Sequence, residues 1–105
     1  MDCRYEDQGA ERELVLDGEL TVYVVDALWA ELAQRLDDAP ARWRLDLSAL
    51  NDFDTAGLQL LLMVHRALAA RGKSCRLGVA PPPVRDLLAL YRAGGWFEWE
   101  AGAAP

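Results

Sequence analysis

Residues 44–58 read Arg-Leu-Asp-Leu-Ser-Ala-Leu-Asn-Asp-Phe-Asp-Thr-Ala-Gly-Leu, which predicts a strand, a loop and the start of a helix in direct succession. Polar and apolar residues alternate over residues 43–47, as they do in a half-buried strand. Asp54 and Thr55 can cap the free backbone N–H groups of a helix whose apolar stretch covers residues 58–68. This segment therefore carries a complete strand-to-helix junction.

Strands and helices alternate outward from this segment. Gly18 is expected to close the first strand, Pro40 to stop the first helix and Gly72 to close the second, while Pro81-Pro82-Pro83 gives an extended lead into the third. The expected strands cover residues 13–17, 43–47, 74–79 and 96–99, the expected helices residues 21–38, 55–72 and 84–91, and the expected frayed tail residues 100–105. Such alternation predicts one small α/β domain over residues 1–105 with a mostly parallel sheet.

The composition limits the classes of partner. The chain has 105 residues, which suffices for one core, and 52% of them are hydrophobic. Its net charge of −6 has the wrong sign for neutralising phosphates, so nucleic acid is not expected as a partner. Cys3 and Cys75 have no metal-ligand spacing and suggest reduced thiols.

The apolar runs are short. The longest, residues 60–64, falls far below the roughly 20 residues of a membrane-spanning helix. The first residues are polar and of mixed charge, unlike an export signal. We expect a cytoplasmic protein with no direct insertion into a membrane.

No catalytic constellation stands out. His65 is the only histidine and lies in a mainly apolar helix, where a packed or surface role is more usual than catalysis. Asp46, Asp52 and Asp54 raise the hypothesis of a small metal-dependent phosphatase-like enzyme, but the related dehalogenase-type pattern has its threonine one residue after Thr55. Capping and solvation explain these carboxylates better, so we expect no enzyme activity, no metal site and no cofactor.

Thr55 presents a hydroxyl at the start of a helix. The free N–H groups and the helix dipole favour negative charge there, so a phosphate could be accommodated. The alternative is that Thr55 only caps the helix.

The sequence resembles the STAS family, the domain shared by anti-sigma factor antagonists and sulfate transporter tails. The resemblance covers roughly residues 11–98 and rests on three blocks in the family's order, namely Gly18-Glu19-Leu20, Leu45-Asp46-Leu47-Ser48 with Phe53 to Leu58, and Pro83-Val84-Arg85-Asp86-Leu87-Leu88. It implies a small mixed, mostly parallel sheet of four to five strands covered by about three helices. It also implies a regulatory role, in which an unphosphorylated antagonist binds an anti-sigma factor kinase and frees the sigma factor.

One position departs from that family. The serine phosphorylated there directly precedes the motif's glycine, and this chain has Ala56 at that place, which leaves the neighbouring Thr55 as the only acceptor. The motif is similar to members of chemotaxis-type signalling clusters, whose partner is a serine/threonine kinase-like or other signalling protein. It is also similar to the small cytoplasmic subunit of the Mla lipid transporter, which binds an ABC ATPase. Nucleotide binding and oligomeric state stay open.

Helical spacing places a possible docking stripe on the second helix. At about 100° per residue, Gln59, Leu62 and Arg66 share the side of Thr55, and Met63 lies nearby. Leu62 and Met63 should therefore be exposed, with the sheet side formed by Leu58, Leu61, Val64 and Leu68. The expected partner-binding residues are Asp54, Thr55, Ala56, Gly57, Gln59, Leu62, Met63 and Arg66. Trp96, Phe97 and Trp99 are expected to cover one end of the core or an edge of the sheet.

Overall fold

The computed structural model describes residues 1–105 and contains one five-stranded sheet whose strand order equals the chain order. The strands are β1 (Asp2–Gln8), β2 (Glu11–Leu20), β3 (Arg42–Phe53), β4 (Ser74–Leu77) and β5 (Glu98–Trp99). β1 and β2 form an antiparallel hairpin, and every other neighbouring pair is parallel. The expected mixed, mostly parallel sheet is confirmed.

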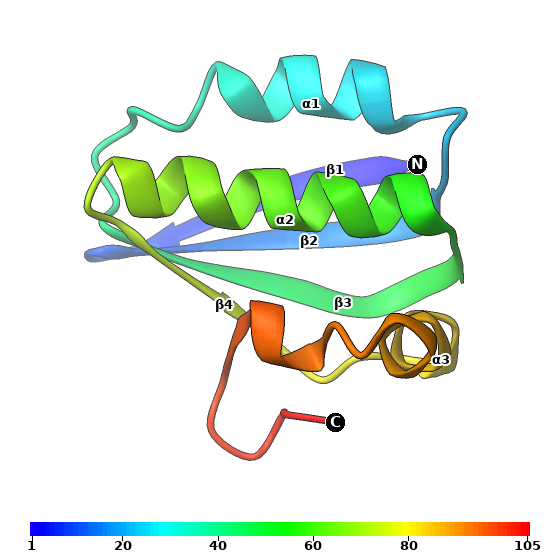
Figure 1. Ribbon diagram of the computed structural model, residues 1–105. Helices are drawn as coiled ribbons and strands as arrows, with labels where there is room; N and C mark the ends of the chain where they lie inside the picture. The colour runs from blue at the N-terminus through cyan, green and yellow to red at the C-terminus, as the bar shows by residue number, and fades with distance from the viewer.

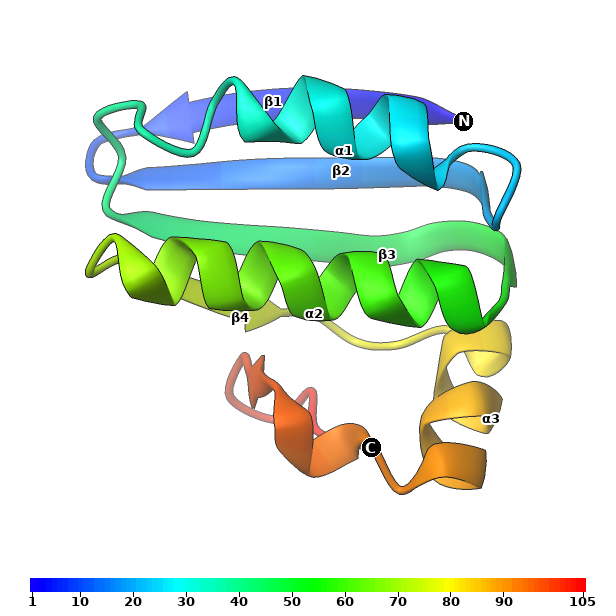
Figure 2. The same cartoon turned by 45° about the horizontal axis from the view of Figure 1, so that its top comes forward.

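The helices are α1 (Val25–Ala33), α2 (Thr55–Ala70) and α3 (Pro82–Tyr91), with a 3₁₀ turn η1 at Gly94–Trp96. α1 and α2 lie on one face of the sheet, and α3 and the C-terminal segment lie on the other (Figure 1). In the view of Figure 2, α1 lies beside β1 and β2, while α2 follows the length of β3. None of the helices is both long and apolar enough to cross a membrane.

The main core lies between the sheet and the layer formed by α1 and α2. On β3, Trp43, Leu45 and Leu47 are fully buried, and the polar residues between them are not, as the alternation predicts. On α2, the expected sheet side is confirmed, because Leu58, Leu61, Val64 and Leu68 are all buried. Leu60, on the flank of this stripe, is buried as well.

Several strand boundaries differ from the expectation. The strand expected over residues 74–79 ends at Leu77, and the one expected over residues 96–99 begins at Glu98, because Trp96 belongs to η1. β2 does not close at Gly18 but runs on to Leu20, because Gly18 adopts φ +119° and the register against β3 shifts on either side of it. Both shifts place the extra residue in β3, and the positive φ of Gly18, which glycine tolerates, lets β2 continue past it. β3 runs without a loop to Phe53, so the strand passes directly into α2 through Asp54.

The remaining differences lie at helix ends and at the termini. α1 is shorter than expected, since residues 34–37 form turns, and α3 already begins at Pro82, where the missing N–H costs no helical hydrogen bond. The tail is not frayed, because Glu100 forms an ion pair with Arg44 of β3 and Ala103 is buried. The polar N-terminal residues form β1, which was not expected.

Candidate functional site at the start of α2

Asp54 is the N-cap of α2 and joins two segments of the chain. Its backbone is extended, and its Oδ1 accepts a hydrogen bond from the Gly57 N–H at 3.0 Å. Its Oδ2 accepts a second hydrogen bond, at 2.9 Å, from the N–H of Val22 in the loop between β2 and α1. The carboxylate therefore fixes that loop beside the start of the helix.

Gly57 lets the first turn of α2 approach the sheet. A Cβ at this position would lie 2.9 Å from two ring carbons of Phe53, and nearer still to the carbonyl oxygen of Leu20. Both distances are shorter than real Cβ contacts, so only glycine fits without a shift of the backbone. The helix start is thus seated directly on the ends of β2 and β3.

Thr55 is exposed at the first position of α2, and its hydroxyl forms no hydrogen bond within the chain. Ala56, next to it, is half-buried and offers no hydroxyl. The free N–H groups of the helix start create a positive potential around Thr55. The geometry therefore leaves this hydroxyl accessible.

The expected docking stripe is only partly exposed. Gln59 and Arg66 are exposed and Met63 is 42% exposed, as expected. Leu62 differs, because it is half-buried and packs against the core. Trp96, which follows α3, lines the same hollow as Leu62.

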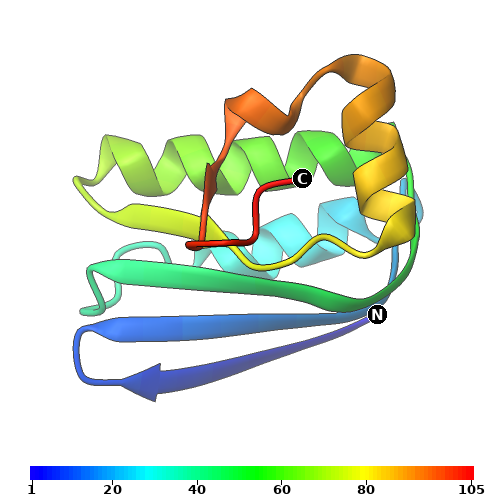
Figure 3. The same ribbon diagram turned by 90° about the horizontal axis from the view of Figure 1, so that it is seen from below.

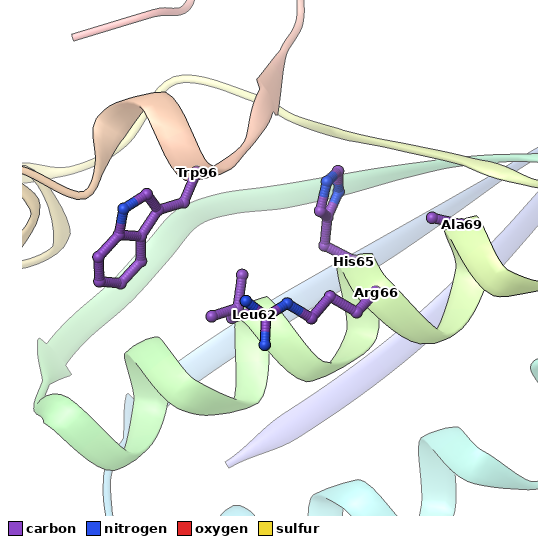
Figure 4. Close-up of a pocket in the computed structure, with 5 residues that line it drawn as sticks. All are labelled: Leu62, His65, Arg66, Ala69 and Trp96. Carbon is purple, nitrogen blue, oxygen red and sulfur yellow. The ribbon is translucent and has the colours of Figure 1, made fainter.

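Two adjoining hollows form a groove beside α2. The first has a volume of about 380 Å³ and is lined by Thr55, Leu58, Gln59, Leu62, Tyr91 and Trp96. The second, also about 380 Å³, is lined by Leu62, His65, Arg66, Ala69 and Trp96. Because both share Leu62 and Trp96, we treat them as one feature, the α2 groove. In Figure 4, His65 and Trp96 project into the space between α2 and the segment that carries Trp96.

Sequence reasoning missed two aromatic members of this groove. Tyr91 is 47% exposed and Trp96 is 48% exposed, so both offer apolar area to a partner. The covering role expected for the terminal aromatics holds for the other two, since Phe97 is buried in the core and Trp99 lies in the edge strand β5. Neither periodicity nor spacing distinguishes Trp96 from its neighbours, because its exposure depends on the tertiary packing of the segment after α3.

The charge of the groove differs from that of the whole chain. Its lining contains Arg66 and His65 but no carboxylate, whereas the chain has a net charge of −6. His65 lies edge-to-face against Phe97, with ring centroids 6.0 Å apart, and its Nδ1 is buried without a hydrogen-bond partner. The groove is therefore apolar with a weakly basic end.

Each of the three carboxylates of the enzyme hypothesis accepts hydrogen bonds from residues close to it in the chain. Asp46 accepts hydrogen bonds from the Ser48 N–H and hydroxyl. Burial alone would raise the pKa of Asp46, but these bonds outweigh it and hold that pKa below its usual value. Asp52 accepts from the N–H of Phe53, and Asp54 caps α2. No group of three or more His, Cys, Asp or Glu side chains is placed to hold a metal ion.

Comparison with known proteins gives a family and a fold. A family model described as "Mlab, STAS domain" matches residues 3–98. The anti-sigma factor antagonist SpoIIAA in its unphosphorylated form is similar in structure, with a TM-score of 0.76, 22% identity, and 94% of this chain and 88% of that chain covered. An anti-sigma factor antagonist from Mycobacterium paratuberculosis gives a TM-score of 0.81 at 20% identity, covering 93% and 83%.

A third similar structure is that of a phosphorylated protein. The Bacillus cell fate determinant SpoIIAA in its phosphorylated form gives a TM-score of 0.70 at 21% identity, covering 94% of this chain and 91% of that chain. At such identities these likenesses show the shared fold. No curated protein matches the chain.

Proposed function

The chain belongs to the STAS domain family, and on that premise we propose that it is a non-enzymatic regulatory module of the anti-sigma factor antagonist type. It acts in the cytoplasm by binding a signalling protein, such as a serine/threonine kinase-like anti-sigma factor. The contact is formed by residues 54–66 and by the α2 groove. The observation that carries the proposal is the groove itself, which continues from the exposed Thr55 hydroxyl.

The side chains around the groove suit a protein contact. Aromatic residues and methionine are enriched in the cores of protein interfaces and often dominate binding energy. Met63, Tyr91 and Trp96 are each between 42% and 48% exposed, close to the polar Gln59 and Arg66. Tyr23, in the loop that Asp54 holds, is 94% exposed and extends the apolar surface available near the helix start.

A charge change at Thr55 would act directly on this contact. Phosphorylation adds nearly two negative charges at neutral pH. Thr55 lines the groove, so the phosphate would sit at its mouth beside Leu58 and Gln59 and would have to be desolvated on docking. We propose that such a modification releases the partner, as Ala56 cannot be the acceptor.

A second candidate function has one observation in its favour. The matching family model bears the description "Mlab", which agrees with an accessory subunit of an Mla-type lipid transporter. In that case the partner is an ABC ATPase, the same groove forms a permanent contact and Thr55 is never modified. The two candidates differ in partner and in the chemical state of Thr55.

The test is an affinity pull-down from the native cell extract with wild type, Thr55→Ala and Thr55→Glu, followed by mass spectrometry of partners and of Thr55. A signalling protein that is lost with Thr55→Glu, together with phosphorylated Thr55, supports the first function. An ABC ATPase recovered with unmodified Thr55 supports the second. Gln34→Glu is the matched control, since it adds a charge at an exposed position after α1, away from the groove. Equal recovery of a signalling protein by all variants would contradict the first function, and absence of an ABC ATPase from every eluate would contradict the second.

A further inference from the structure

β1 is an edge strand with a free outer side. It pairs only with β2, and Figure 3 shows it as the outermost strand with no segment beyond it. The hairpin closes at the pair Gln8↔Glu11 through the two-residue loop Gly9-Ala10, and the register continues without a bulge. In such a hairpin the closing pair is hydrogen-bonded and the pattern alternates along the strand. The backbone groups of Cys3, Tyr5 and Asp7 therefore point outward, away from β2.

Two charged side chains of β1 form no ion pair within the chain. Arg4 and Glu6 are exposed, and neither takes part in an ion pair. Glu6 lies directly opposite Glu13, and like charges in that arrangement are destabilising. The edge thus has a free cation and a free anion two residues apart on the same face.

We propose that a second copy of this chain pairs with β1, antiparallel, about a two-fold axis at Tyr5. The axis passes between the two Tyr5 residues, whose outward N–H and carbonyl groups bond to each other. This register places Arg4 opposite the second copy's Glu6, and symmetry repeats the pair. Cys3 then faces Asp7, and Asp2 faces Gln8, so no like charges oppose each other across the new pair.

The charge pattern selects this register among the alternatives. An axis at Arg4 would oppose the two Arg4 side chains, an axis at Glu6 the two Glu6 side chains and an axis at Asp7 the two Asp7 side chains. An axis at Cys3 would avoid repulsion but would pair only the first few residues. Only the axis at Tyr5 uses all of β1 (Asp2–Gln8) and matches its charges.

The pairing leaves the proposed docking surface open. α2 lies over the opposite part of the sheet from β1, as Figure 3 shows. A dimer of this kind would extend the sheet continuously and present two α2 grooves. Its failure or success is therefore independent of whether the groove binds a partner.

Charge exchange tests the register. Sedimentation velocity from micromolar to millimolar chain concentration should show a concentration-dependent dimer for wild type, weakened at least several-fold in Arg4→Glu and in Glu6→Arg. The double variant Arg4→Glu/Glu6→Arg should dimerise like wild type. Mixing the two single variants should form a heterodimer, because each then supplies the charge that the other lacks.

Amide hydrogen exchange gives a second readout. With rising concentration, the amides of Cys3, Tyr5 and Asp7 should gain protection, while those of Arg4 and Glu6 are already bonded to β2. A wild type that stays monomeric, or a dimer indifferent to both single variants, overturns the proposal. So does failure of the double variant to restore dimerisation while circular dichroism shows it folded.

Discussion

The carboxylate of Asp54 and the backbone N–H of Val22 lie 32 positions apart in the chain and form a hydrogen bond of 2.9 Å. The same carboxylate caps α2, so one side chain sets the position of both the helix start and the loop before α1. Both segments border the surface around Thr55. The shape of that surface therefore depends on Asp54 without requiring Asp54 to touch a partner.

Replacing Asp54 with alanine should lower the free energy of unfolding by about 1–2 kcal/mol, because the cap and the bond to Val22 are both lost. Urea unfolding followed by circular dichroism measures the change. Asp54→Asn keeps one strong oxygen acceptor and should lose less. An unfolding midpoint unchanged in Asp54→Ala would contradict the bridging role.

Replacing Gly57 with alanine should destabilise the fold by about 1–3 kcal/mol, although alanine is the better helix former. The added methyl group would press on the Phe53 ring and the Leu20 carbonyl, and neither can yield without moving a strand end. Gly95→Ala is the control, since nothing lies within 4 Å of a Cβ there. Equal urea midpoints for the two variants would show that the close approach is unimportant.

Replacing Trp96 with alanine should weaken partner binding about tenfold or more, as expected for an aromatic anchor at the centre of an interface. Leu90→Ala provides a control, because Leu90 is 73% exposed but lies outside the groove. Isothermal titration with the partner recovered in the pull-down compares the affinities of the two variants.

Leu62→Glu should also abolish docking, provided urea unfolding shows that this half-buried position tolerates the charge. Full binding by both groove variants would place the contact elsewhere.

Stability should fall in acid. The bond from Arg12 lowers the pKa of Asp7, and the bond from Arg44 lowers the pKa of Glu100. Each carboxyl thus binds protons less readily in the folded than in the unfolded protein. Its contribution to the free energy of unfolding is therefore fully present above the ordinary pKa values, 3.8 for Asp7 and 4.5 for Glu100, and is lost as the pH falls through the lower pKa of the folded state. Urea unfolding between neutral pH and about pH 3 should show this, with a shallower decline in Glu100→Gln. An identical slope in that variant would exclude the Arg44 contact as a cause.

The sequence predicts the centre of the molecule better than its margins. β3 and α2 were recognised because burial imposes a strong period of alternation or of helical turns on them. The sequence pattern does not predict β1, because an exposed edge strand needs few apolar residues and only Cys3 and Tyr5 of this strand pack against the core. The ordered tail was missed because Glu100 meets Arg44 across 56 positions, a separation that no local pattern reveals.

The candidate site also contains residues that the local sequence predicts and residues that only the tertiary structure adds. Asp54, Thr55 and Gly57 belong to one continuous motif, so their shared location follows from the chain itself. Tyr91 and Trp96 join them only because the end of α3 turns back along α2. Helical spacing predicts the correct side of the helix for Leu62, but it does not predict that Leu62 packs against the core.

The agreement between strand order and chain order has a consequence for how the domain is made. Each strand's neighbour in the sheet is also its predecessor or successor in the chain, so no strand must insert between two that are already paired. During synthesis the β1–β2 hairpin can form as soon as it emerges, and β3, β4 and β5 can then add to the growing edge in turn. The ribosome therefore delivers the strands in the order in which the sheet can accept them.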